Sequence, residues 1–139
     1  MGGLPLTEAV TEDKTAFRRA LVVDDEGGLL LLVRAILEHS SYLVDVAHDG
    51  VEACEHVKHT VYDVIICDIR MPNMDGPTFY SRLRQINQAQ AEKVVFVTGL
   101  DLDRETLDRL RESGCPVLHK PFEVTQFAEV VNAIADRRG

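Results

Sequence analysis

A single carboxylate, Asp68, follows residues 64–67 (Val-Ile-Ile-Cys), an apolar run that predicts a strand buried on both faces. Turn-forming residues occupy positions 72–76, directly behind it. A charge at the end of a buried strand is unfavourable unless water, a cation or a hydrogen-bond donor reaches it. Because ligands of open α/β sheets bind at this end of the strands, Asp68 is a candidate for chemistry. The alternative interpretation is an aspartate that only caps the following turn.

Other polar side chains occupy the same position relative to the strands predicted around them. In parallel sheets the carboxyl ends of all strands meet at one edge, so such side chains are expected to lie close together. Three carboxylates at one edge repel, because two unit charges about 4 Å apart cost on the order of 4 kcal/mol at an effective dielectric constant of about 20. The polar residues that follow predicted strands are Asp24, Asp25, Asp68, Thr98 and Lys120.

This set of side chains has a specific chemical use. A divalent cation and the ammonium group of Lys120 would offset the repulsion, and hard oxygen ligands in an open site suit Mg²⁺. A carboxylate beside Mg²⁺ and a lysine can attack phosphorus and form an acyl phosphate. The cation, Lys120 and Thr98 would then stabilise the charge on the equatorial phosphoryl oxygens. The spacing therefore predicts phosphoryl transfer to an aspartate.

The elements that must position these residues alternate along the chain. Short β-branched runs alternate with segments that carry apolar residues at helical spacing. This alternation predicts an α/β fold: a five-stranded, doubly wound parallel sheet with right-handed crossovers and helices on both faces. Strand 42–47 alternates apolar and polar residues and is expected at an edge of the sheet. The predicted strands are 20–23, 42–47, 64–67, 94–97 and 116–118, and the predicted helices are 29–40, 50 onward, 77–87, 103–113 and one containing residues 127–134.

Length, charge and cysteine content exclude several classes of protein. The 139 residues suffice for one domain with its own core. A net charge of −8 argues against nucleic acid or an anionic membrane as a direct partner. The longest apolar run, residues 29–33, is too short to span a bilayer. Three cysteines without a CxxC pair indicate free thiols, a reducing compartment and a cytoplasmic location. Residues 1–18 are expected to be a tail or linker remnant and residues 19–139 the domain.

In this order, the motifs resemble the receiver domain of the two-component response-regulator family, over about residues 19–138. The resemblance implies the flavodoxin-like strand order 2-1-3-4-5 and a Mg²⁺-dependent phosphorelay reaction. The implied partner is a histidine kinase or a histidine phosphotransfer domain, whose phosphohistidine supplies the phosphoryl group. The motifs are residues 23–26 (Val-Asp-Asp-Glu), Asp68 with residues 71–76, residues 97–99 (Val-Thr-Gly) and residues 120–122 (Lys-Pro-Phe).

The resemblance also implies the metal ligands. Asp25 binds Mg²⁺ directly, and Asp24 helps directly or through a bound water. Asp68 and the backbone carbonyl of Arg70 complete the protein ligands.

For the phosphoryl group, the resemblance implies that Asp68 is the acceptor. Thr98 donates a hydrogen bond to the phosphoryl group and Lys120 pairs with it. The Lys120–Pro121 peptide bond is expected to be cis. Most receivers have Tyr or Phe three residues before this lysine, whereas this chain has Val117, so the usual coupling of the threonine to an output surface is in doubt.

Two positions near the acceptor predict slow loss of the phosphoryl group. In related receivers, the residues two after the acceptor and two after the threonine flank the path of the attacking water. Here they are Arg70 and Leu100. Leucine cannot orient a water molecule and the arginine would shield the phosphoryl oxygens, so we expect a long-lived phosphoaspartate.

The first predicted helix carries a candidate docking surface. Leu32 and Val33 belong to the stripe that is expected to face the sheet. Leu31 falls on the opposite side and Leu30 beside it, where a histidine-bearing helical partner would approach. We hypothesise that Leu30 and Leu31 form an apolar docking patch; the alternative is ordinary surface.

Residues 93–99 and 114–122 resemble most closely the receivers attached to hybrid sensor kinases, whose parent kinase can be membrane-anchored. A free-standing single-domain response regulator is the main alternative. An aspartyl-phosphate phosphatase or phosphotransferase is a further alternative, but it usually has a second aspartate two residues after the nucleophile, where this chain has Arg70. A pseudo-receiver that only binds partners is disfavoured by the complete set of site residues. The domain is thus expected to be a signalling module with self-catalysed phosphotransfer and dephosphorylation.

Overall fold

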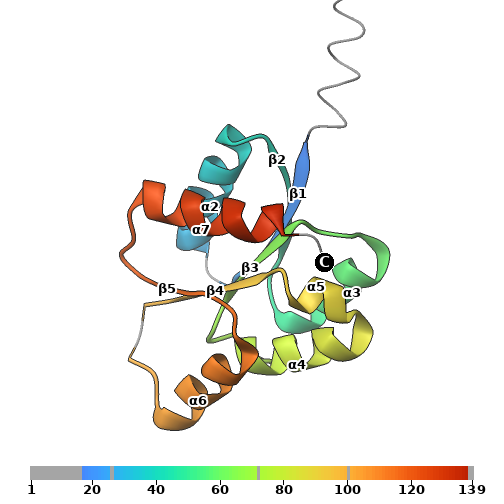
Figure 1. Ribbon diagram of the computed structural model, residues 1–139, viewed down its shortest axis with the longest axis vertical. Helices are drawn as coiled ribbons and strands as arrows, with labels where there is room; N and C mark the ends of the chain where they lie inside the picture. Colours follow the sequence, from blue (N-terminus) through green and yellow to red (C-terminus); the bar gives the residue numbers. More distant parts are fainter. Residues whose placement is uncertain (1–16, 26, 72, 100, 138–139) are drawn as a thin grey trace, which may run out of the picture.

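The computed structural model describes residues 17–25, 27–71, 73–99 and 101–137 (Figure 1). The expected tail, residues 1–18, lies outside the described residues except for its last two positions, and the first strand begins at Arg18. No helix in these ranges has the length and apolar character needed to cross a membrane. The elements are β1 (Arg18–Val23), α2 (Gly27–His39), β2 (Tyr42–Ala47), α3 (Gly50–His59), β3 (Val64–Asp68), α4 (Gly76–Ile86), α5 (Gln88–Ala91), β4 (Val94–Thr98), α6 (Arg104–Ser113), β5 (Val117–His119) and α7 (Val124–Asp136).

The five strands form one parallel sheet in the order β2-β1-β3-β4-β5. This confirms the predicted α/β class, the parallel sheet and the strand order. Strand β2 lies at an edge, as its alternating pattern predicts, whereas β3 and β4 are buried along their whole length. These two strands tolerate an unbroken apolar sequence because helices cover both faces of the sheet.

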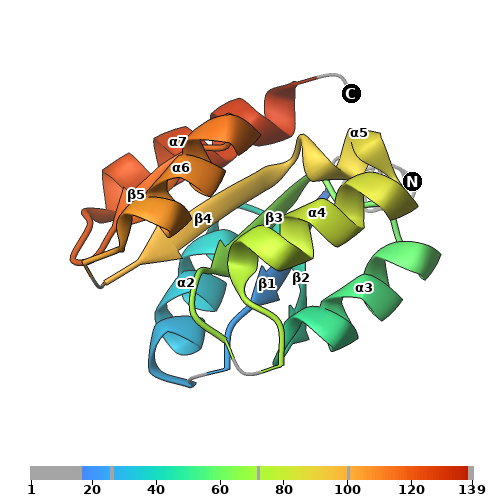
Figure 2. The ribbon, with the colours of Figure 1, turned by 90° about the horizontal axis from the view of Figure 1, so that it is seen from below.

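Alternate residues of each strand contribute to two separate cores. Leu21 and Val23 of β1 pack in the cluster under α3 and α4, while Ala20 and Val22 pack in the cluster under α2 and α7. Figure 1 shows α2 and α7 together on one side of the sheet, and Figure 2 shows α3 and α4 side by side on the other. The period of two along each strand thus supplies both faces with apolar side chains.

The orientation of α2 differs from the prediction. Val33 and Leu37 are buried and Leu31 is 74% exposed, as expected, but Leu32 is 50% exposed and Leu30 packs against the core. The buried face of α2 is centred on Val33 and Leu37. Consecutive residues of a helix are rotated by about 100°, so Leu32, directly before Val33, is turned away from that face. The exposed pair is therefore Leu31 and Leu32, not Leu30 and Leu31.

A short helix, α5, was not predicted because residues 88–91 carry no apolar period. Asn87 caps it by accepting a hydrogen bond from Gln90 N at 3.2 Å. The buried Gln90 side chain then bonds both backbone groups of Tyr62, each at 2.8 Å. Tertiary hydrogen bonding thus stabilises a segment that local sequence does not identify.

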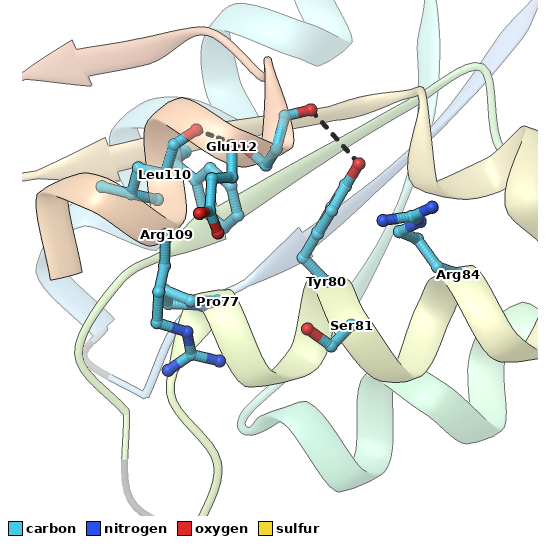
Figure 3. A pocket seen from close by; sticks show the side chains of 9 residues that line it. Pro77, Tyr80, Ser81, Arg84, Arg109, Leu110 and Glu112 are labelled. Atoms are coloured by element: carbon cyan, nitrogen blue, oxygen red, sulfur yellow. Dashed lines mark hydrogen bonds between the residues drawn. The ribbon is translucent and has the colours of Figure 1, made fainter. Parts of the chain in front are cut away.

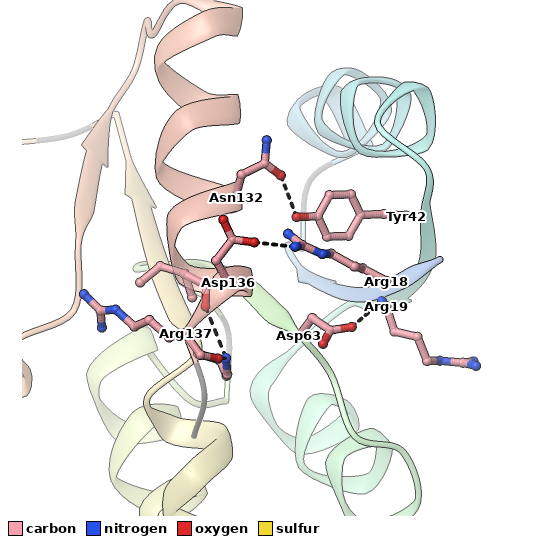
Figure 4. A network of polar contacts seen from close by, with 9 residues as sticks. Arg18, Arg19, Tyr42, Asp63, Asn132, Asp136 and Arg137 are labelled. Carbon is pink, nitrogen blue, oxygen red and sulfur yellow. Dashed lines mark hydrogen bonds and ion pairs between the residues drawn. The ribbon is translucent and has the colours of Figure 1, made fainter. Parts of the chain in front are cut away.

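A polar network closes the edge of the sheet where β1 and β3 begin (Figure 4). Arg18 of β1 pairs with Asp136 of α7, and Tyr42 OH donates to Asn132 Oδ1 at 2.8 Å. The buried Lys93 side chain donates to the Ile134 carbonyl at 3.2 Å, at the end of α7. These contacts hold α7 against the amino-terminal ends of the strands, opposite the end that carries Asp68.

Candidate acidic site at the carboxyl edge of the sheet

The ends of β1 and β3 bring three carboxylates together. Val23 is in register with Cys67, so Asp24, directly after β1, and Asp68, at the end of β3, lie at the same level of the sheet. One carboxylate oxygen from each of Asp24, Asp25 and Asp68 lies within 4.8 Å of the others. Among the described residues, no other three acidic, histidine or cysteine side chains meet this criterion.

The environment of Asp68 disfavours its charge. The residue is only 8% exposed. Loss of hydration raises the pKa of its carboxyl group from 3.8 to about 6; the ammonium of Lys120 opposes this rise, and the charge of Asp24 and a hydrogen bond with Asp24 add to it. The Arg70 amide lies 3.4 Å from Asp68 Oδ1, so the backbone of residue 70 approaches the carboxylate while its side chain is exposed. A cation bound between the carboxylates would offset their electrostatic repulsion.

Strands β4 and β5 add the other two predicted side chains. Thr98 ends β4 and is buried, and its carbonyl accepts a hydrogen bond from Lys120 N at 2.7 Å. A Cβ on Gly99 would lie 3.3 Å from Lys120 Cδ, so the lysine side chain crosses directly over the glycine. The Lys120–Pro121 bond is cis, which confirms that expectation. Val117 is half-buried against the α3–α4 core, and Leu100 lies outside the described residues.

The loop behind Asp68 is held closely against the strand end. Gly76 N donates to the Ile69 carbonyl at 2.7 Å. A Cβ on Gly76 would lie 2.9 Å from the Asp68 carbonyl oxygen, a contact that real side chains do not make. Met74 is buried in the core and packs over Gly50. Gly76 therefore has little freedom to move independently of Asp68.

Asp75 has a structural role that the sequence analysis did not assign. Its carboxylate caps α4 by accepting a hydrogen bond from Thr78 N at 2.8 Å. The signal was present, because an aspartate followed two residues later by Pro77 is typical of a helix start. The helix therefore begins at Gly76, one residue earlier than expected.

Cys67 adjoins Asp68 in the chain but belongs to the core. Strand alternation turns it to the α3–α4 side, and its thiol donates to the Asp68 carbonyl oxygen at 3.1 Å. Burial raises the pKa of the Cys67 thiol well above its ordinary value, which disfavours the reactive thiolate. Cys67 is therefore a core residue.

The comparisons with known proteins agree with this geometry. A family model described as the response regulator receiver domain matches residues 20–132. The response regulator Rre1 of Synechocystis sp. is 35% identical over 122 residues, which are 85% of this chain and 52% of that protein. The chemotaxis protein CheY of Bacillus subtilis is 29% identical over 115 residues, 82% of this chain and 94% of that protein. The chain thus spans about half the length of Rre1 and nearly all of CheY.

A solved structure gives the same result. The signal receiver domain of a signal transduction histidine kinase from Syntrophus aciditrophicus aligns with a TM-score of 0.77 at 26% identity. The alignment covers 88% of this chain and 95% of that domain.

Proposed function

Since the chain belongs to the response regulator receiver family and is a receiver domain of two-component signalling, we propose that Asp68 accepts a phosphoryl group from a phosphohistidine in a Mg²⁺-dependent reaction. One observation supports this proposal above all: three carboxylates converge at the strand ends, beside Thr98 and Lys120. Uncompensated, such a cluster destabilises the folded chain, so its presence indicates a ligand.

The donor set fits Mg²⁺. We assign Asp24, Asp25 and Asp68 as carboxylate ligands and the backbone carbonyl of Arg70 as a further oxygen ligand. Oxygen donors from carboxylates and carbonyls, with open positions left for water and phosphoryl oxygens, are what this cation prefers. When bound, Mg²⁺ neutralises charge on the carboxylates and on the transferred phosphoryl group.

In this proposal, Asp68, Lys120 and Thr98 have distinct roles in the transfer step. A carboxylate oxygen of Asp68 forms the new bond to phosphorus while the phosphorus–nitrogen bond to the donor histidine breaks, and the imidazole leaves with the bonding electron pair. Lys120 stabilises the developing negative charge, and the hydroxyl of Thr98 donates a hydrogen bond to the phosphoryl group. The raised pKa of Asp68 means that the acceptor must lose its proton before it attacks.

We propose that the partner, a histidine kinase or a histidine phosphotransfer domain, docks on α2. Leu31 and Leu32 are exposed on this helix, which starts just after the acidic pair. Further along α2, Ile36 lines a cavity of about 400 Å³ together with Val124 and Ala128 of α7. An apolar face of a helix that carries the phosphohistidine could bury these side chains while it presents the histidine to Asp68.

For the parent protein, we favour a hybrid histidine kinase with the receiver on its cytoplasmic side. The likeness to a receiver domain of a histidine kinase supports this origin. The alternative is a free-standing response regulator, which the nearly full-length match to CheY supports. Slow dephosphorylation, expected from Arg70 and Leu100, would suit a relay that passes its phosphoryl group onward.

The test is to incubate the protein with acetyl phosphate, with and without Mg²⁺, and to measure intact mass and the modified peptide. We expect one phosphoryl adduct on Asp68, formed only with Mg²⁺ and absent from Asp68→Asn. Asp108→Asn, at an exposed position of α6, serves as the matched control and should be modified normally. A full adduct on Asp68→Asn would contradict the assignment.

A further inference from the structure

Helix α6 makes few buried apolar contacts with the rest of the domain. Among its residues only Leu110 is buried, and Arg104, Glu105, Asp108 and Arg111 are exposed. The helix packs on α4 more than on the sheet. An element with few buried apolar contacts is easily displaced or opened locally. The position of α6 therefore depends on its polar contacts with α4.

Two such contacts flank a small cavity of about 100 Å³ between the helices (Figure 3). At one end, Tyr80 OH of α4 donates to the Ser113 carbonyl at 3.2 Å. At the other end, Arg109 Nη2 donates to Thr78 Oγ1 at 3.2 Å and Arg109 Nη1 lies 3.7 Å from Asp75 Oδ2. The two terminal nitrogens of one guanidinium group thus join α6 to the first turn of α4.

The Arg109 contact is connected to the acidic site through the backbone of Asp75 and Gly76. Asp75 caps α4, and the next residue, Gly76, is hydrogen-bonded to Ile69 and lies against the Asp68 carbonyl. A shift of residues 68–70 must therefore move the first turn of α4, because close backbone contacts leave no slack. The Tyr80 contact lacks this connection, since it lies one turn further along α4.

We propose that Arg109 is a positioning residue that couples occupancy of the acidic site to the stability of α6. This inference rests on the proposed binding of Mg²⁺ by the carboxylates. A ligand that fixes Asp68 and Ile69 also fixes the first turn of α4, which strengthens the Asp75–Arg109–Thr78 contact and so holds α6 more firmly. By linkage, loss of Arg109 must weaken the binding of Mg²⁺ by the same factor.

The experiment measures amide hydrogen exchange of α6 and Mg²⁺ affinity by calorimetry in the same protein samples. In the parent, saturating Mg²⁺ should slow exchange of the α6 amides by about fivefold, a coupling typical of linked sites. In Arg109→Gln this protection should fall below about twofold, and the Mg²⁺ dissociation constant should rise by a similar factor. Circular dichroism and thermal melting verify that each variant is folded.

Two further variants distinguish coupling of the acidic site to α6 from simple stabilisation of α6 by its contacts with α4. Arg111→Gln removes the same charge from α6, but among the described residues Arg111 pairs with Asp108 of its own helix, at 4.0 Å, so protection by Mg²⁺ should remain. Tyr80→Phe removes the other contact; α6 should exchange faster overall, yet still respond to Mg²⁺. Equal protection of α6 in the parent and in Arg109→Gln would overturn the inference while leaving Mg²⁺ binding intact. Absence of Mg²⁺ binding in the parent would overturn the proposed function and the coupling together.

Discussion

The carboxyl groups of Asp24 and Asp68 lie close together at the ends of the neighbouring strands β1 and β3. Burial, together with the nearby charge of Asp24, raises the pKa of the Asp68 carboxyl group to about 6. In the metal-free site Asp68 therefore retains its proton to higher pH than an ordinary aspartate does. Function and stability conflict here, since the ionised form that binds a cation is the form that the fold disfavours.

The first prediction concerns stability and pH in the absence of metal. Because the folded-state pKa of Asp68 is raised from 3.8 to about 6, the folded chain binds more protons than the unfolded chain between these values, and its stability falls as the pH rises through this window. The full shift corresponds to about 3 kcal/mol, and water at the sheet edge reduces it, so Asp68→Asn should stabilise the metal-free protein by about 1–2 kcal/mol at pH 7.

Urea denaturation in EDTA at pH 4 and pH 7 checks this. The advantage of Asp68→Asn over the parent should be small at pH 4 and larger at pH 7. Asp108→Asn is the control. An advantage of the same size at both pH values would show that the carboxyl group of Asp68 is not responsible.

The second prediction concerns the metal ligands. Asp25 is exposed, so Asp25→Asn should fold normally but bind Mg²⁺ at least tenfold more weakly, a loss of about 1.4 kcal/mol. Calorimetric titration measures the affinity. Asp101→Asn changes an exposed aspartate outside the cluster and should bind Mg²⁺ as the parent does. Unchanged affinity in Asp25→Asn would remove this residue from the ligand set.

The third prediction uses a pair of glycines. At Gly76 an added methyl group would meet the Asp68 carbonyl oxygen at 2.9 Å and Ile69 Cα at 3.0 Å, and neither backbone atom can turn aside. Gly76→Ala should therefore cost about 1–3 kcal/mol of stability and also weaken Mg²⁺ binding, because residues 68–70 must move.

Gly114→Ala is the matched control for this change. Gly114 has a φ of +72° and no atoms near the added carbon, so alanine there should cost about 1–2 kcal/mol through backbone strain alone. Its Mg²⁺ affinity should be unaffected. If both variants bind Mg²⁺ like the parent, the close contact at Gly76 has no influence on the site.

The fourth prediction tests the docking surface on α2. Leu31→Ser should slow phosphoryl transfer from a cognate phosphohistidine donor about tenfold, since burial of a leucine contributes roughly 1.5 kcal/mol. Transfer from acetyl phosphate should not change. Val61→Ser is the control, because Val61 is 73% exposed, against 74% for Leu31, and precedes the start of β3 rather than following a strand end. An equal rate for Leu31→Ser and the parent would identify Leu31 as ordinary surface.

Local sequence was sufficient to predict most of the fold. The β-branched runs and the helical spacing between them are properties of neighbouring residues, and each strand was found within about two residues of its place. The bounds of α6 also follow from local sequence: Asp103 starts the helix by accepting a hydrogen bond from Thr106 N and Gly114 ends it, which agrees with the predicted range 103–113. The sheet order came from the resemblance and is confirmed by the strand pairing.

The local pattern of the chain already shows that the site residues follow the ends of predicted strands, and the parallel topology then requires them to meet: Asp24, Asp25, Asp68, Thr98 and Lys120. The exposed leucines of α2 could not be read from that pattern, because the rotation of a helix depends on the whole surface against which it packs. The same holds for α5, which Gln90 and Tyr62 stabilise from separate segments. It holds also for the contact of Arg109 with Asp75 and Thr78, because such long-range pairs follow from the packing of two helices and leave no local pattern in the chain.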